Sequence, residues 1–132
     1  MSSNFVYYIF SNNFVRVEKD GKYNLLDSQG NLVSPDWFDD VSYFNKNLVL
    51  VEKKGQYNLL DSQGNLVSPD WFDDVSYFNR NLIIVEKSKK YNLLDKQGQF
   101  LIAQWFDGIW DLENGFVKVK KRGKYNLLNV QD

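Results

Sequence analysis

The sequence contains no cysteine, no histidine and no threonine among its 132 residues. Without cysteine there is no disulfide framework and no thiolate chemistry. Without histidine there is no imidazole base near neutral pH, and no Ser-His or Cys-His dyad. A glycine-rich phosphate loop and a metal-ligand motif are missing as well. Carboxylate pairs are the only catalytic chemistry left, so we expect a protein that is not an enzyme and uses no cofactor or metal.

An excess of charge of one sign is also missing. Lys and Arg number 16 against 17 Asp and Glu, which gives a net charge of −1. This balance favours neither nucleic acid nor an anionic membrane as a partner. The N-terminal stretch MSSNFVYYIF has no basic region, and its apolar run is too short for a signal sequence or a membrane span. We therefore expect a soluble, cytoplasmic protein.

The feature that organises the chain is a repeat of 34 residues. Residues 57–79 repeat residues 23–45 identically, and weaker copies lie on either side. A fixed period of this length indicates stacked supersecondary units. We predict one domain, 1–132, made of four units over roughly 1–30, 31–64, 65–98 and 99–132.

Each unit is predicted to be an antiparallel meander of three strands, so the fold class is all-β. In one copy, residues 74–78, 82–86 and 91–95 have the β-branched and aromatic content of strands. Pro69 breaks the segment that precedes them, because proline cannot sit inside a central strand. No window combines helical periodicity with helix caps.

Glycines mark the predicted turns. The two-residue hairpin before the third strand needs φ > 0, and three of the four copies place a glycine there. The remaining copy has Ser88-Lys89, so its hairpin tip is expected to be looser. The polar turn after the third strand has Gly30 at its expected left-handed position.

The ends of the repeat array favour an open arrangement. The first unit lacks the leading Asn-Leu-Val-Ser-Pro segment, and no unit is divided between the two termini. Whole units with degenerate ends are typical of a short, open, twisted array with caps. A closed, propeller-like ring is the alternative.

The repeat pattern carries a family resemblance. Gly-Lys-Tyr-Asn-Leu-Leu-Asp-x-x-Gly-x-x-Val-x-Pro-x-Trp-Phe-Asp-x-Val-x-x-Phe, followed by a Val-x-Val-x-Lys strand, resembles the WG-type repeats of bacteria. The resemblance implies a β-rich repeat of bacterial and some phage-borne proteins, largely of unassigned function, with no catalytic motif to transfer. Tyr-Asn replaces the family's Trp-Gly, and Asn tolerates φ > 0 better than other non-glycine residues. We therefore predict φ > 0 or a bulge at Asn24, Asn58, Asn92 and Asn126.

The repeated Trp-Phe-Asp segments are the first candidate site. An aromatic ring beside carboxylates can hold a sugar, by stacking and by accepting hydrogen bonds from its hydroxyls. The candidate sugar-binding residues are Trp37, Trp71, Trp105, Asp39 and Asp73. The alternative is that the aromatic rings pack between units and the aspartates cap turns, which a motif built into every repeat favours.

The middle strands supply the second candidate site. Arg16 and Lys118 occupy a position that is apolar in the inner units. If that strand face is open, an apolar stripe for a protein partner is formed by Leu48, Leu50, Leu82 and Ile84. If neighbouring units cover it, these residues are core and the charged ends are caps. The valines that alternate with this position are predicted to face the core.

The basic residues supply the third candidate site. They gather on the middle strands and hairpins, whereas acidic residues gather at the opposite bend, so stacking predicts a basic ridge and an acidic ridge. Lys120, Lys121 and Arg122 are the candidate phosphate or partner contacts. The alternative is that these lysines protect strand edges from aggregation.

These observations favour a non-enzymatic scaffold that binds a protein partner, or a second copy of itself, through its repeat surface. The alternatives are a lectin-like module that uses the repeated tryptophans, and a phage-encoded inhibitor of a host protein.

Overall fold

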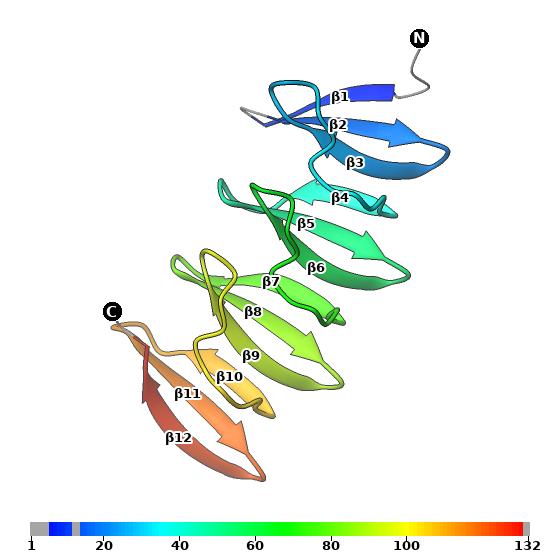
Figure 1. Ribbon diagram of the computed structural model, residues 1–132. Coiled ribbons are helices and arrows are strands. Elements are labelled where there is room, and N and C mark those ends of the chain that lie inside the picture. Colours follow the sequence, from blue (N-terminus) through cyan, green and yellow to red (C-terminus); the bar gives the residue numbers. More distant parts are fainter. Residues whose placement is uncertain (1–5, 12–13, 131–132) are drawn as a thin grey trace. The chain divides into compact units, whose positions relative to one another are not determined.

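The computed structural model describes residues 6–11 and 14–130, and this part of the chain consists of β-strands joined by turns, as Figure 1 shows. The strands are β1 (Val6–Ser11), β2 (Phe14–Lys19), β3 (Lys22–Leu26), β4 (Asp40–Tyr43), β5 (Leu48–Lys53), β6 (Gln56–Asp61), β7 (Asp74–Asn79), β8 (Leu82–Lys87), β9 (Lys90–Asp95), β10 (Gly108–Asp111), β11 (Phe116–Lys121) and β12 (Lys124–Asn129). Over these residues no helix has the length and apolar character needed to cross a bilayer.

The strands form four antiparallel sheets of three strands each. The sheet orders are β1-β2-β3, β4-β5-β6, β7-β8-β9 and β10-β11-β12. Each sheet is one repeat, which confirms the all-β prediction and the three-stranded meander. Within the described residues, 6–11 and 14–130, no strand of one sheet pairs with a strand of another sheet, so the sheets do not form a closed barrel or ring.

The four sheets are distributed over two compact units. The first unit, Met1–Asp70, contains the first two sheets, and the second, Trp71–Asp132, contains the last two.

The middle strands β2, β5, β8 and β11 contribute valines to the core, as alternation predicts. Val17, Val51 and Val85 are fully buried, and Val117 and Val119 of the fourth repeat are buried as well. Alternate residues of a strand point to opposite faces, so the face that carries these valines is apolar except at the last residue of each strand, which is a lysine. The prediction that these valines face the core is confirmed.

The hairpins have the predicted left-handed residues. Asp20 and Gly21 have φ of 54° and 76°. Ser88 and Lys89 adopt the same conformation without glycine, with φ of 52° and 64°. Gly30, in the turn after β3, has φ of 81°, which confirms its predicted position.

Three connections, over residues 27–39, 62–73 and 96–107, are here called bend segments. Each runs back along the outer edge of the third strand that precedes it. In the first unit, Tyr23 and Phe38 exchange two backbone hydrogen bonds of 2.8 and 2.9 Å. Val33 N–H donates to Leu25 O at 2.8 Å. In the second unit the bend segment follows β9 in the same way (Figure 1), through backbone bonds that include Leu101 N–H to Leu93 O at 3.1 Å.

The prediction of φ > 0 or a bulge at the repeated asparagines is wrong. None of them is among the residues with positive φ, and the register is regular around them. Asn24 is instead a buried link to the bend segment. Its Nδ2 donates to Ser34 O and Asp36 O, both at 2.9 Å, and its Oδ1 accepts from Leu25 N–H at 2.7 Å. The position needs the amide side chain, not an unusual backbone.

Candidate interaction surface on the fourth sheet

The aspartates of the Trp-Phe-Asp segments are engaged in contacts that hold the repeats together. Asp39 Oδ1 accepts from the ammonium group of Lys22 in the preceding repeat. Asp39 Oδ2 accepts from Lys54 N–H of its own hairpin at 2.7 Å. Two hydrogen bonds lower the pKa of Asp39 below its ordinary value. The bond from Lys22 has the larger effect, and the bond from Lys54 N–H the next largest.

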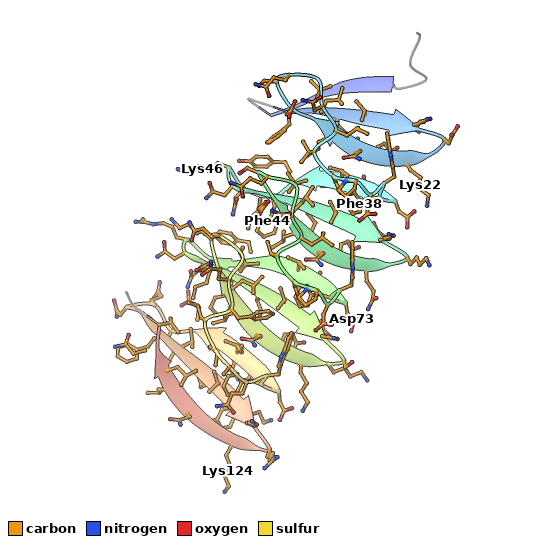
Figure 2. All side chains as sticks on the ribbon, in the orientation of Figure 1. Lys22, Phe38, Phe44, Lys46, Asp73 and Lys124 are labelled. Atoms are coloured by element: carbon orange, nitrogen blue, oxygen red, sulfur yellow. The ribbon has the colours of Figure 1, made fainter. Side chains whose placement is uncertain are left out.

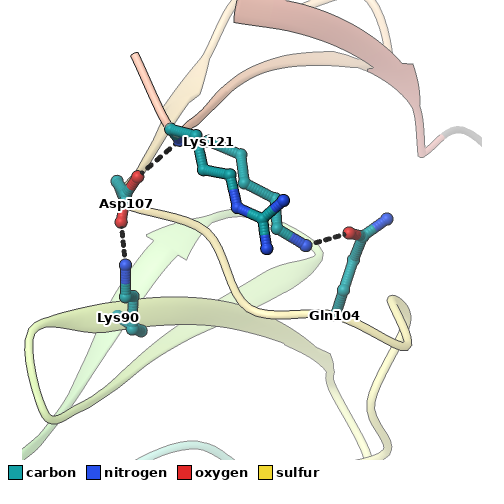
Figure 3. Close-up of polar contacts among 5 residues, drawn as sticks. Lys90, Gln104, Asp107 and Lys121 are labelled. Atoms are coloured by element: carbon teal, nitrogen blue, oxygen red, sulfur yellow. Dashed lines mark hydrogen bonds and ion pairs between the residues drawn. The ribbon is translucent and has the colours of Figure 1, made fainter. Parts of the chain in front are cut away.

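The second unit repeats this arrangement around Asp107, as Figure 3 shows. Asp107 accepts from the ammonium group of Lys90 and, at 2.9 Å, from Arg122 N–H, and these two bonds lower its pKa. Asp73 accepts from Ser88 N–H at 2.8 Å. Basic and acidic residues therefore meet in these contacts, which corrects the expectation of two separate ridges.

The candidate tryptophans Trp37, Trp71 and Trp105 are all partly buried. Trp105 packs against two aromatic residues of its own unit, with ring centroids 6.3 Å from Phe72 and 6.0 Å from Phe100. Trp105 thus covers Phe72, which is fully buried. Its indole serves packing between two consecutive repeats.

The candidate apolar stripe is mostly core. Leu48 and Leu82 are 1% and 6% exposed, so they do not contribute to a surface. Leu82 belongs to a cluster with residues of the fourth sheet, including Val117. Leu50 and Ile84 are partly buried. Leu82 and Ile84 are covered because their face of the third sheet packs on the fourth sheet.

The three basic candidates lie near one hairpin but have different surroundings. Lys121 Nζ donates to Gln104 Oε1 at 2.6 Å, across to the bend segment (Figure 3). Arg122 uses its backbone N–H on Asp107. Lys120 Nζ lies 5.6 Å from the ring centroid of Tyr125.

That tyrosine belongs to an exposed surface that sequence reasoning missed. The register pairs Trp110 with Lys118, Lys118 with Leu127, and Lys120 with Tyr125, so these side chains share one side of the sheet. We call this side the aromatic face of the fourth sheet. Its residues are Trp110, Phe116, Lys118, Lys120, Tyr125 and Leu127.

The aromatic face of the fourth sheet is exposed to solvent, whereas the equivalent face of the third sheet is buried. Leu93 of β9 is fully buried, whereas Leu127, 34 positions later, is 57% exposed. Trp110 is 43% exposed and Tyr125 58% exposed. In the third repeat the equivalent face packs on the fourth sheet. Among the described residues, no further sheet packs on the aromatic face of the fourth.

The aromatic face is also ordered by its own contacts. The rings of Trp110 and Tyr125 lie 6.1 Å apart, and Lys118 Nζ lies 5.1 and 4.9 Å from their centroids. Such cation–π contacts hold the cation over the rings. Gly108 makes room for this arrangement, since a Cβ there would lie 2.4 Å from the Trp110 ring.

A sequence signal for this face does exist. Trp110 replaces Ser42 and Ser76 of the inner repeats, and Gly108 replaces Asp74. A large aromatic and the glycine that accommodates it therefore appear together in one copy. The pair is recognisable only once the register places both residues on the same face.

Comparison with known proteins gives a family and distant structural neighbours. Hsv2 of Kluyveromyces lactis shares 12% identity over 98% of this chain and 47% of that chain, with a TM-score of 0.40. PorZ of Porphyromonas gingivalis, an essential bacterial surface component of the type-IX secretion system, shares 13% identity over 98% of this chain and 21% of that chain, with a TM-score of 0.35. The chain thus spans about half the length of the Hsv2 chain.

No curated protein matches the sequence. A family model does: the WG containing repeat matches residues 5–23, 25–57, 59–91 and 93–125. The four matches are consecutive and agree with the four sheets. The chain belongs to the family of WG-containing repeat proteins.

Proposed function

We propose that the protein is a non-enzymatic interaction module that binds another protein through the aromatic face of the fourth sheet. The observation that carries the proposal is the contrast between Leu93, which is buried, and Leu127, which is exposed at the same position of the repeat. In the third repeat the next sheet covers this face, and in the fourth repeat the equivalent face is exposed. Contiguous apolar surface of this kind is typical of interaction sites.

The composition of the face fits a protein partner. Trp110 and Tyr125 are the residue types that most often dominate binding energy, because they bury a large area and lose few rotamers. Lys118 and Lys120 add positive charge beside these rings. A partner with an apolar patch and carboxylates at its rim complements such a face.

Other functions have less support. Two of the carboxylates that a sugar would need, those of Asp39 and Asp73, already accept backbone N–H groups of the hairpins. Inhibition of a host protein by a phage-encoded chain is a narrower form of the same binding proposal.

The test compares proteins captured from a cell extract by the wild-type chain and by Trp110→Ser/Tyr125→Ser. Serine is the residue found at the position of Trp110 in the second and third repeats, so the fold should tolerate it. The matched control is Tyr43→Ser/Tyr77→Ser, which removes two other exposed aromatics. Circular dichroism melting checks that all three proteins are folded.

We expect a captured protein that the control binds and the Trp110→Ser/Tyr125→Ser variant does not, with affinity then measured on the purified pair. Loss of both aromatic anchors should weaken that affinity by about a hundredfold or more. Equal capture by all three folded proteins would refute the aromatic face as the binding surface.

A further inference from the structure

A second open surface lies along the outer edge of β12, next to the aromatic face, and Tyr125 contributes its side chain to the face and its main chain to the edge. In the first unit the edge of β3 is covered by a bend segment, through the paired hydrogen bonds of Tyr23 and Phe38. In the second unit Tyr91 and Phe106 pair in the same way at the edge of β9. Tyr125 is the equivalent residue of β12, and its backbone N–H has no partner in the part of the chain that the structure describes.

Asn126 is already oriented for such a segment. Its Oδ1 accepts from Leu127 N–H at 2.8 Å, the same local bond that Asn58 makes with Leu59 N–H at 2.8 Å. In the inner repeats this bond leaves Nδ2 pointing at the carbonyl oxygens of the bend segment. Asn126 is exposed, and over the described residues its Nδ2 meets no acceptor.

A cavity lies beside this edge where a bend segment would place its aromatic side chain. It measures about 370 Å³, and Phe106, Val119 and Leu128 supply its apolar wall. Phe106 is the equivalent of Phe72, which in the third repeat is covered by Trp105 of the following bend segment. The cavity therefore corresponds to a position that a tryptophan fills one repeat earlier.

The charge at this edge is also complementary to a bend segment. Lys22 and Lys90 each bind the aspartate of the bend segment that covers their strand. Lys124 is their equivalent, and Figure 2 shows it projecting from the β11–β12 hairpin, away from the ribbon. No carboxylate lies within ion-pair distance of Lys124 among the described residues.

We propose that the edge of β12 binds an extended segment of another protein that has the chemistry of this chain's own bend segments. Its main chain pairs with Tyr125, two of its carbonyl oxygens accept from Asn126 Nδ2, and its tryptophan enters the cavity against Phe106. An aspartate two residues after the tryptophan pairs with Lys124. This is recognition by strand addition, in which backbone bonds give affinity and side-chain contacts give specificity.

The probe is a fluorescein-labelled peptide of sequence NLVSPDWFDD, the sequence of residues 31–40, titrated with the full chain and followed by fluorescence polarisation. Asn126→Asp keeps the acceptor for Leu127 N–H and removes both Nδ2 donors, so it tests the contact without altering the fold. We expect saturable binding that Asn126→Asp weakens by about tenfold or more. The matched control Asn129→Asp, which adds the same charge on the other side of β12, should bind as the wild type does.

A charge exchange tests the ion pair. Lys124→Asp should weaken binding, and the peptide NLVSPDWFKD should restore it; Lys96→Asp is the control for charge alone. No saturable binding up to about 1 mM chain, or equal binding of a scrambled peptide, would overturn the proposal. Self-association of the chain that Asn126→Asp abolishes, without peptide binding, would overturn the assigned occupant in favour of a second copy. The peptide is also titrated with Trp110→Ser, which changes the aromatic face and not the edge of β12, and unchanged peptide affinity of this variant keeps the two proposals separate.

Discussion

Replacement of Asn58 by alanine tests how the repeats are joined. Asn58 is fully buried, and its Nδ2 donates to Ser68 O at 2.9 Å and Asp70 O at 3.1 Å. Its Oδ1 accepts from Leu59 N–H at 2.8 Å. Alanine removes all three hydrogen bonds without changing the backbone preference greatly.

The expected cost follows from the burial of the partners. Each lost hydrogen bond contributes about 1 kcal/mol to stability, and a buried partner left unpaired costs more. Ser68 is buried, so its carbonyl stays unpaired, whereas Asp70 is exposed and its carbonyl can bind water. We expect Asn58→Ala to lower the free energy of unfolding by about 2–4 kcal/mol, and the melting temperature by roughly 6–12 °C for a chain of this size.

Asn126→Ala is the matched control, because it lies in the same Tyr-Asn-Leu-Leu sequence but is exposed. Its effect should stay within about 0.5 kcal/mol. Urea unfolding followed by circular dichroism measures both variants. Asn58→Gly separates two explanations, since a position that needs φ > 0 would accept glycine without loss. Equal stability of Asn58→Ala, Asn58→Gly and the wild type would refute the role assigned to the amide.

Three further predictions follow from other matched positions. Gly64→Ala should destabilise the chain more than Gly30→Ala: both have φ above 80°, but only at Gly64 would a Cβ lie 1.8 Å from a backbone oxygen. Leu93→Ala should cost about 2–5 kcal/mol, against less than about 0.5 kcal/mol for Leu127→Ala, as urea unfolding will show. Because the pKa of Asp39 is lowered on folding, its contribution to stability is present above its ordinary pKa of 3.8 and is lost as the pH falls through the folded value. Stability measured from pH 6 down to about 2 should therefore fall less steeply in Asp39→Asn, and an unchanged slope would contradict this.

Most of the fold could be predicted from the sequence, because local chemistry determines it. The repeat period gave the number of sheets, and alternation along the middle strands placed Val17 and Val51 in the core. Gly30 indicated its turn, since only glycine adopts positive φ without strain. The alternation and the turn glycine depend on neighbours in sequence and are visible in a single copy of the repeat, whereas the number of sheets follows from the number of copies.

The role of the repeated asparagines could not be predicted, because it depends on partners in another part of the repeat. Asn24 bonds to Ser34 and Asp36, ten and twelve residues away. The family's glycine at this position indicates a need for positive φ, whereas the asparagine acts through its side chain. Hydrogen bonds from an asparagine side chain to residues ten and twelve positions away have no signature in the local sequence.

The burial of the candidate apolar stripe could not be predicted for a similar reason. Leu82 and Lys118 occupy the same side of consecutive sheets, but the first is covered by the next repeat and the second is not. The exposure of a strand residue therefore depends on whether another sheet packs on its face. The pattern of residues along the strand does not contain this information. The open surface is found at the fourth repeat, where Trp110 and Tyr125 stand beside Lys118.

The most direct test of the central claim, that the aromatic face is an open binding surface, uses the absence of cysteine from the chain. Leu127→Cys and Leu93→Cys each introduce the only thiol, at matched positions that are 57% and 0% exposed. The rate of alkylation by a maleimide is measured for each variant, with and without the protein captured through Trp110. We predict fast alkylation of Leu127→Cys, slowed by the bound partner, and slow alkylation of Leu93→Cys in both cases. A Leu127→Cys thiol that is unreactive in the free protein, or that reacts equally fast in the complex, would contradict the account.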